Sequence, residues 1–150
     1  MPQSASTASP REVFERALES IRDVQMDVYA DLFSADAVFE LPFAPPGIPR
    51  RIEGQDAIRA FILAGADRVR AASPQFQFHS VVVHETVDPD VIVTEFEVHG
   101  VSTVEPYQFS NLQVMTVRNG EIVSLRDYWN PLDRRELAAL TDPDAPRQEN

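Results

Sequence analysis

The dipeptide Asn119-Gly120 stands between two stretches of alternating apolar and polar residues. Both residues tolerate the positive φ angles of a tight turn between antiparallel strands, so this pattern predicts a β-hairpin. We expect its strands at Tyr107 to Arg118 and at Glu121 to Trp129. The hairpin fixes the architecture of the C-terminal half, because any strand before it must extend the same sheet or start another.

Two earlier runs also read as strands, from Gln75 to Thr86 and from Val91 to Gly100. The segment Asp88-Pro89-Asp90 between them has the composition of a turn. Together with the hairpin, these runs predict a long antiparallel meander over the second half of the chain.

The first half carries helical signals. Ser9, Pro10 and Glu12 form a capping box with proline at the first helical position, which predicts a helix from Pro10 to about Asp23. A short helix is expected from Met26 to Phe33, with Tyr29 and Phe33 on one face.

A strand over Ala37 to Leu41 is expected to end at the proline-rich segment that follows it. A third helix is expected after Gly54, where Ile58, Phe61 and Ile62 give an apolar stripe. A short helix capped by Asn130 is expected to close the fold.

Helices followed by a meander predict an α+β fold, with the helices packed on one face of a strongly curved, mostly antiparallel sheet. At 150 residues the chain is expected to form one domain. We assign it to residues 10–140, between a disordered leader at 1–9 and a flexible tail at 141–150. A bent sheet closed by helices encloses a hollow, where small-molecule sites are found.

Composition excludes several kinds of chemistry. The net charge of -11 argues against nucleic acid and anionic membranes as partners. The chain has no cysteine and its 13 basic residues are all arginine, so neither a thiolate nucleophile nor a Schiff base is available. With five glycines it has no glycine-rich phosphate loop, and we expect no cofactor. The start lacks a signal-peptide pattern and no apolar run could span a membrane, so a cytoplasmic location is expected.

Strand alternation on the last strand predicts which side chains face the hollow. One face would carry Val123, Leu125, Asp127 and Trp129, and the other Ile122, Ser124, Arg126 and Tyr128. The first set is apolar except for Asp127, which would lose hydration there and have its pKa raised toward that of a general base. Alternatively, Asp127 accepts hydrogen bonds that lock the strand end, or the alternation slips near Pro131 and the acid faces water.

The preceding strand offers neutral donors beside this acid. Asn111, Gln113 and Met115 share a face, so Asn111 could stabilise a carbonyl or a developing enolate, while Gln113 reads as an ordinary strand residue. Tyr29 could point its hydroxyl into the cavity mouth or be a core tyrosine with a satisfied hydroxyl.

Histidines and acids elsewhere suggest weaker sites. Glu95, Glu97 and His99 alternate along one strand, a pattern more typical of a solvated sheet face or a subunit contact than of a metal site. We therefore expect no metal. His79 and His84 are expected on opposite faces.

Three stretches carry a family resemblance: YADLFSADAVFELPF, RIEGQDAIRAFI and NLQVMTVRNGEIVSLRDYWNPL. They resemble the SnoaL-like group of the nuclear transport factor 2 (NTF2-like) superfamily, which is related to ketosteroid isomerases and polyketide cyclases. The resemblance covers about Val13 to Leu132. It implies a cone of three helices against a curved sheet, and a homodimer through the outer sheet face with Arg126 and Tyr128 near the contact.

The resemblance also implies site residues. In the polyketide cyclases and phenazine-biosynthesis relatives an acid lies on the last strand, and Asp127 matches it. The base position of ketosteroid isomerases matches Leu41, and the histidine of the phenazine relatives matches Phe61, so both groups are replaced here. The Arg-x-Asp pattern of the limonene-type epoxide hydrolases is missing from the predicted strands.

These observations predict a cofactor-independent enzyme that moves a proton next to a carbonyl of a small apolar metabolite, as an isomerase, cyclase or dehydratase. Asp127 would be the base, and Asn111 with Tyr29 the oxyanion donors. The alternative is a non-catalytic binding protein that uses the same pocket. The predicted pocket walls are Trp129, Phe33, Phe39, Leu41, Phe61, Gln113, Met115 and Leu125.

Overall fold

The computed structural model describes residues 7–72, 75–101 and 106–129, except for the side chains of 68–75. The described part contains the helices α1 (Pro10–Arg22), α2 (Met26–Asp31) and α3 (Gln55–Ala72). None of these helices is long and apolar enough to cross a membrane. The predicted closing helix, the tail and most of the leader lie outside the described residues.

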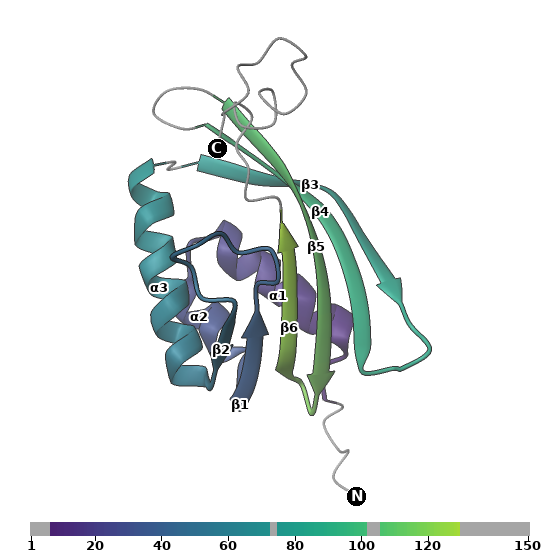
Figure 1. Ribbon diagram of the computed structural model, residues 1–150. Helices are drawn as coiled ribbons and strands as arrows, with labels where there is room; N and C mark the ends of the chain where they lie inside the picture. The colour runs from purple at the N-terminus through teal and green to yellow at the C-terminus, as the bar shows by residue number, and fades with distance from the viewer. Residues whose placement is uncertain (1–6, 73–74, 102–105, 130–150) are drawn as a thin grey trace, which may run out of the picture.

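The six strands of the described chain form one sheet in the order β2-β1-β6-β5-β4-β3. Neighbouring strands are antiparallel except for β1 and β6, which are parallel. The sheet curls around the helices, which cover one of its faces (Figure 1). The predicted α+β cone is confirmed. The strands are β1 (Phe33–Glu40), β2 (Arg51–Glu53), β3 (Gln75–Glu85), β4 (Val91–Val101), β5 (Pro106–Arg118) and β6 (Glu121–Trp129).

The region around Phe33 departs from the sequence prediction. Phe33 begins β1 and does not end the second helix, and β2 was not foreseen. The amide N–H of Ile122 donates to the carbonyl of Leu32 over 2.8 Å, and the side chain of Gln55 donates to the carbonyl of Phe33 over 2.7 Å. Because of these bonds, the chain leaves the helix after α2 and Phe33 joins the sheet.

Two irregularities in strand pairing change which side chains share a face. In β6, Val123 is an extra residue between the pairs Val117–Ile122 and Thr116–Ser124. Such a bulge shifts the alternation by one residue. Ile122 therefore lies on the inner face with Leu125, both fully buried, and the predicted inner position of Val123 is wrong.

A second irregularity lies between His79 and Val82 in β3, where Ser80 has a φ of 54°. It brings His79 and His84 to the same outer face, so their predicted placement on opposite faces is wrong.

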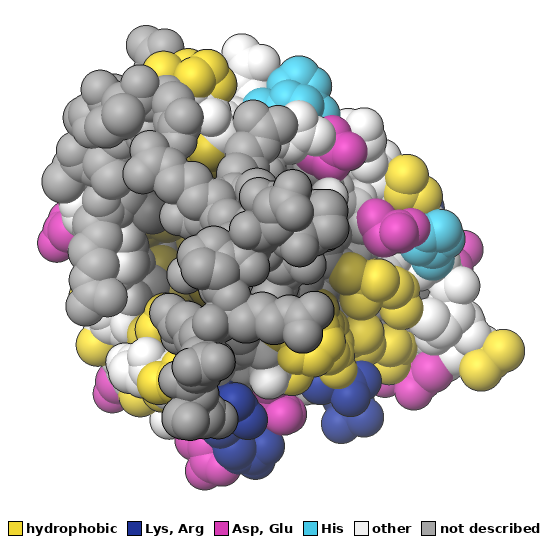
Figure 2. Space-filling model, turned by 45° about the horizontal axis from the view of Figure 1, so that its top comes forward, with side chains coloured by type: hydrophobic (Ala, Val, Ile, Leu, Met, Phe, Trp, Pro, Cys, Tyr) yellow, Lys and Arg dark blue, Asp and Glu magenta, His cyan; other side chains and the backbone are white. Residues whose placement is uncertain are grey.

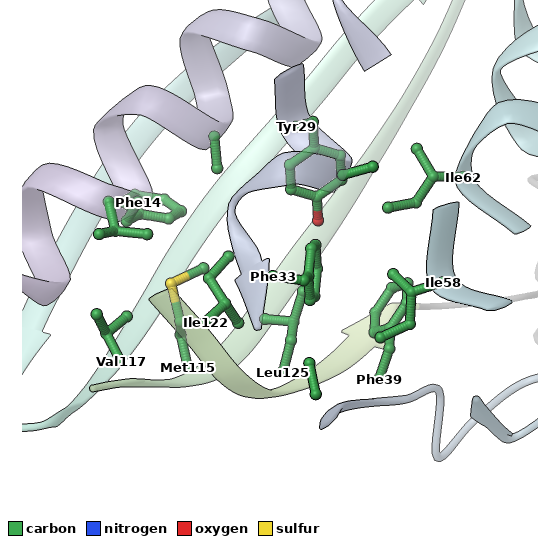
Figure 3. Close-up of a cluster of buried hydrophobic side chains, with 14 of the residues drawn as sticks. Phe14, Tyr29, Phe33, Phe39, Ile58, Ile62, Met115, Val117, Ile122 and Leu125 are labelled. Atoms are coloured by element: carbon green, nitrogen blue, oxygen red, sulfur yellow. The ribbon is translucent and has the colours of Figure 1, made fainter. Parts of the chain in front are cut away.

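The core fills the space between the helices and the sheet. Phe14, Phe33, Ile58, Met115 and Leu125 are almost completely buried and come from five different elements. Figure 3 shows Tyr29 lying over Phe33, with its hydroxyl turned into this cluster. The two rings meet edge to face with centroids 5.5 Å apart, a favoured aromatic geometry.

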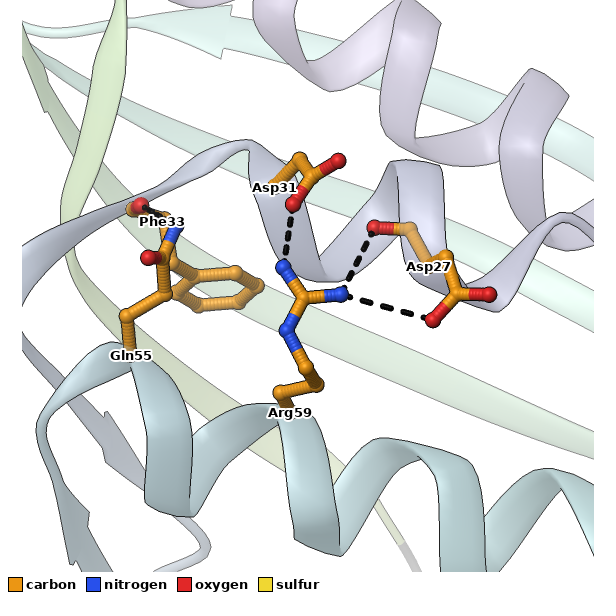
Figure 4. A network of polar contacts seen from close by, with 5 residues as sticks. All are labelled: Asp27, Asp31, Phe33, Gln55 and Arg59. Carbon is orange, nitrogen blue, oxygen red and sulfur yellow. Dashed lines mark hydrogen bonds and ion pairs between the residues drawn. The ribbon is translucent and has the colours of Figure 1, made fainter.

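One arginine ties α2 to α3. Arg59 of α3 pairs with the carboxylate of Asp31, and contacts Asp27 at its carboxylate over 3.4 Å and at its backbone carbonyl over 3.5 Å (Figure 4). Exposed ion pairs stabilise a fold little, but several bonds to one guanidinium fix a short helix in place. This matters because α2 carries Tyr29.

The turn from α1 into α2 is a Schellman motif without glycine. The N–H of Gln25 donates to the carbonyl of Ser20 over 2.7 Å, and that of Val24 to Ile21 over 3.1 Å. Val24 consequently has a φ of 59°, although a β-branched residue is strained in the left-handed region. Its side chain is 43% exposed, so it contributes little packing in return.

We expect Val24→Gly to raise the free energy of unfolding by about 1 kcal/mol, because relief of the left-handed strain exceeds the added entropy of the unfolded chain. Val24→Ala, which also has a Cβ, should gain less. Urea unfolding of both variants measures the difference. A less stable Val24→Gly protein would contradict the assigned strain.

Candidate active site

The Val123 bulge determines which residues of β6 face the interior of the fold. Beyond it, Gln113 is paired with Asp127, and Asn111 with Trp129. Asn111 and Gln113 are buried on the inner face of β5. Asp127 therefore faces inward, as the alternation from Leu125 predicts, and the prediction's water-facing alternative does not apply.

The carboxylate of Asp127 is held by two amides of one neighbouring strand. The Nδ2 of Asn111 donates to Oδ1 over 3.0 Å, and the Nε2 of Gln113 donates to Oδ2 over 3.1 Å. Each carboxylate oxygen thus receives one neutral donor, and each keeps a further lone pair. Gln113, predicted as a pocket wall and otherwise as an ordinary strand residue, makes the same kind of contact as Asn111.

The pKa of Asp127 is raised from its ordinary value, because burial disfavours the charged form. The hydrogen bonds from Asn111 and then Gln113 act in the opposite direction but do not cancel the effect of burial. A carboxylate whose pKa is raised in this way is a stronger base than one in water. Its two amide contacts also fix its orientation.

Tyr29 reaches the same region from α2. The residue is 8% exposed. Burial, followed by the negative charge of Asp127, raises the pKa of the hydroxyl well above its ordinary value. The hydroxyl stays protonated at neutral pH, so it can donate a hydrogen bond.

Two buried polar atoms of the described residues have no hydrogen-bond partner: Oδ1 of Asn111 and Oγ1 of Thr94. Thr94 is paired with Gln113, so Thr94, Gln113 and Asp127 form one row across three strands of the inner face. An unpaired buried polar atom costs about 1–3 kcal/mol, so such atoms in a native fold need an explanation.

The predicted pocket residues fall into two groups. Phe61 and Trp129 are partly exposed, and Phe61 meets Phe39 edge to face at 5.9 Å, while Gln113 is buried beside Asp127. The others are packed into the buried core beneath: Phe33, Phe39, Leu41, Met115 and Leu125.

Sequence reasoning missed part of the inner wall. Phe78 of β3 meets Phe96 of β4 edge to face at 5.5 Å and Phe76 at 5.6 Å. Phe96 is paired with Asn111, next to the acid. The alternation of Phe76 and Phe78, and of Thr94 and Phe96, could have indicated these residues.

The outer sheet face carries the histidines. His84 contacts Glu95 over 2.7 Å and His99 contacts Glu97 over 2.8 Å, while His79 stacks on His99 with ring centroids 4.1 Å apart. Within the described ranges, no three His, Asp or Glu side chains are placed to hold a metal ion.

Beside these pairs lies an open groove of about 690 Å³. It is lined by Phe43, Glu95, Ser110, Asn111, Leu112, Val114, Tyr128 and Trp129. Phe43 and Leu112 are 58% and 38% exposed. Figure 2 shows hydrophobic side chains gathered beside acidic and histidine side chains on this side of the molecule.

Comparison with known proteins identifies similar chains. A family model described as a SnoaL-like domain matches residues 14–125. The uncharacterized protein YesE of Bacillus subtilis is 36% identical over 132 residues, 82% of this chain and 87% of YesE. The uncharacterized PhzA/B-like protein PA3332 of Pseudomonas aeruginosa is 33% identical over 87% of this chain and 89% of its own length.

A solved structure from Bacillus subtilis, named as a proposed isomerase, superposes with a TM-score of 0.72. It is 32% identical and covers 81% of this chain and 86% of its own.

The raised pKa of Asp127 predicts how stability depends on pH. Between the pKa of the unfolded chain and the raised pKa of the folded protein, the folded state binds more protons, so stability falls as pH rises. Asp127→Asn removes this ionisation. The variant should be more stable than wild type above the folded pKa, and the gain should disappear as pH falls toward the unfolded value.

Urea unfolding from pH 3 to pH 8 measures this effect, with the exposed Asp36→Asn as a baseline for the same chemical change. If the gain of Asp127→Asn were the same at every pH, the carboxylate would not be ionising against its surroundings.

Proposed function

The chain belongs to the SnoaL-like family of the NTF2-like superfamily, and from that premise we propose that it is a cofactor-independent enzyme. It would transfer a proton next to the carbonyl of a small, mostly apolar metabolite. The observation that carries the proposal is the desolvated Asp127 carboxylate, oriented by two amides. A base with a pKa raised toward neutrality is suited to such a transfer.

In the proposed reaction, Asp127 takes the proton from the carbon adjacent to the carbonyl. The electrons of the broken C–H bond form the enolate, with its charge on the former carbonyl oxygen. The carboxyl group then returns the proton to another carbon of the substrate, so an isomerisation needs no further reactant. Cyclisation or dehydration could start from the same enolate.

Tyr29 is the proposed donor to the developing oxyanion. Its hydroxyl is protonated, because burial and then the negative charge of Asp127 raise its pKa. Donors aimed at the developing charge in a dry site stabilise a transition state strongly. Asn111 has committed one N–H to Asp127, so it contributes chiefly by holding the base.

The substrate would enter past the partly exposed Trp129 and Phe61 and would contact Gln113 beside the acid. The buried group Phe33, Phe39, Leu41, Met115 and Leu125 would form the floor of the pocket.

One observation favours the second candidate, a binding protein without turnover. Leu41 and Phe61 are apolar, and each stands where relatives carry a titratable group. Asp127 would then serve as a hydrogen-bond acceptor for the ligand. A binder would tolerate asparagine at position 127, whereas a base would not.

Exchange of carbon-bound protons tests the reaction without knowledge of the substrate. A panel of bicyclic and polycyclic ketones in D₂O, followed by NMR, should show deuterium incorporation next to the carbonyl with the wild-type protein. Asp127→Asn should lower the rate by about 10²–10⁴-fold, the usual contribution of a general base. Asp36→Asn should leave it unchanged. Equal exchange by wild type and Asp127→Asn would exclude Asp127 as the base.

We also propose that the outer groove is the contact of a homodimer. Phe43 and Tyr128 meet edge to face at 5.4 Å and, with Leu112 and Val114, give an apolar surface. The net charge of -11 opposes association of two copies, but Glu95 is paired with His84 beside the groove. This pairing lowers the local repulsion when the histidine is protonated.

Leu112→Glu should convert a dimer into a monomer, because it places an unpaired charge in the buried contact. Val87→Glu, in the exposed turn between β3 and β4, is the control and should stay dimeric. Sedimentation velocity at several concentrations measures both. A wild-type protein that remains monomeric at high concentration would refute the proposed contact.

A further inference from the structure

The unpaired carbonyl oxygen of Asn111 restricts the class of ligand that this site can take. The amide has two ends with opposite requirements, since nitrogen donates and oxygen accepts. An ionised carboxylate only accepts, so the Nδ2 end must face Asp127, as it does over 3.0 Å. Oδ1 is thereby turned away from the acid, and the amide cannot rotate without breaking that bond.

The described protein offers no donor to this oxygen. Asn111 is 9% exposed and its Oδ1 is buried without a partner. Its cross-strand neighbours on the inner face are Phe96, which has no donor, and Trp129, whose indole N–H makes no hydrogen bond to it. Gln113 makes the equivalent bond to Asp127, but none of its atoms is both buried and unpaired.

We propose that Asn111 is a specificity-determining residue, whose Oδ1 accepts a hydrogen bond from a hydroxyl or N–H group of the substrate. Resting on the proposed function, this narrows the substrate to an apolar carbonyl compound that also carries a donor. Tyr29 would donate to the carbonyl oxygen and Asn111 would accept from the donor. A ligand without a donor would leave Oδ1 buried and unpaired, which weakens binding.

The same geometry gives Asn111 two functions. Its nitrogen orients the base, and its oxygen accepts a hydrogen bond from the substrate. One rigid amide therefore positions both the carboxylate of Asp127 and the donor group of the substrate. Gln113 orients the base only. This difference supplies a matched pair of variants, because Asn111→Leu and Gln113→Met each remove one donor to Asp127 at little change in volume.

Equilibrium binding to matched ligands tests the inference. The probes are the isomeric hydroxy-tetralones and their methyl ethers, which share a bicyclic ketone and differ in one donor. NMR titration of the wild-type protein should show at least one hydroxy-tetralone binding about tenfold or more tightly than its ether. The preference should disappear in Asn111→Leu and persist in Gln113→Met. Thermal unfolding confirms that each variant is folded, and Asn111→Ala replaces Asn111→Leu if the larger side chain prevents folding.

Equal affinity of every hydroxy-tetralone and its ether for the wild type would overturn the inference, as would a preference that survives in Asn111→Leu. Absence of saturable binding by all hydroxylated probes would overturn it as well. The measurement involves no turnover, so it separates this inference from the proposed reaction. A wild-type protein that shows the donor preference but catalyses no exchange would refute only the proposed catalysis. A wild-type protein that catalyses exchange but shows no donor preference would refute only the role of Asn111 Oδ1.

Discussion

The pairing of Asp127 with Gln113 rests on a single extra residue in β6. In the hairpin, Val117 faces Ile122, and without the Val123 bulge the same register would bring Arg126 opposite Gln113 and Tyr128 opposite Asn111. The inner face would then receive a guanidinium next to two amide donors, and Asp127 would face the outer groove. The bulge shifts the strand so that the acid meets the amides. Bulges near active sites re-aim side chains in this way, and here the whole candidate site depends on it.

The sequence predicts regular features well because they repeat. The capping box at Ser9 and the Asn119-Gly120 turn are local signals, and both appear in the structure as expected. The order of helices and strands then limits the fold to helices on one face of a meander. The alternation of side chains along β6 predicts that Asp127 faces inward. This alternation holds from Leu125 onward, although it fails at Val123.

The missed features are those without a repeating pattern. The bulges at Ser80 and Val123 have no glycine to mark them, and Val24 occupies a left-handed position usually taken by glycine. The short strand β2 forms because Arg51–Glu53 can pair with β1 after the proline-rich segment, a long-range contact that no local signal reports. Likewise, the bond from Gln113 to Asp127 follows from cross-strand register, so Gln113 could not be separated from an ordinary strand residue by its own position.

The polar row on the inner face is hard to explain as a device for stability. A desolvated carboxylate with a raised pKa and two unpaired buried oxygens all lower the stability of the fold, and apolar residues at these positions would pack against Phe96 and Met115 without that loss. Features that weaken a fold persist where they serve binding or chemistry. Asp127 in this row is a base whose orientation is fixed, Tyr29 adds a protonated donor on a helix held by Arg59, and Asn111 adds an acceptor without a partner. A carbonyl compound with its own donor would satisfy these groups, so its binding would offset the stability that they cost the fold.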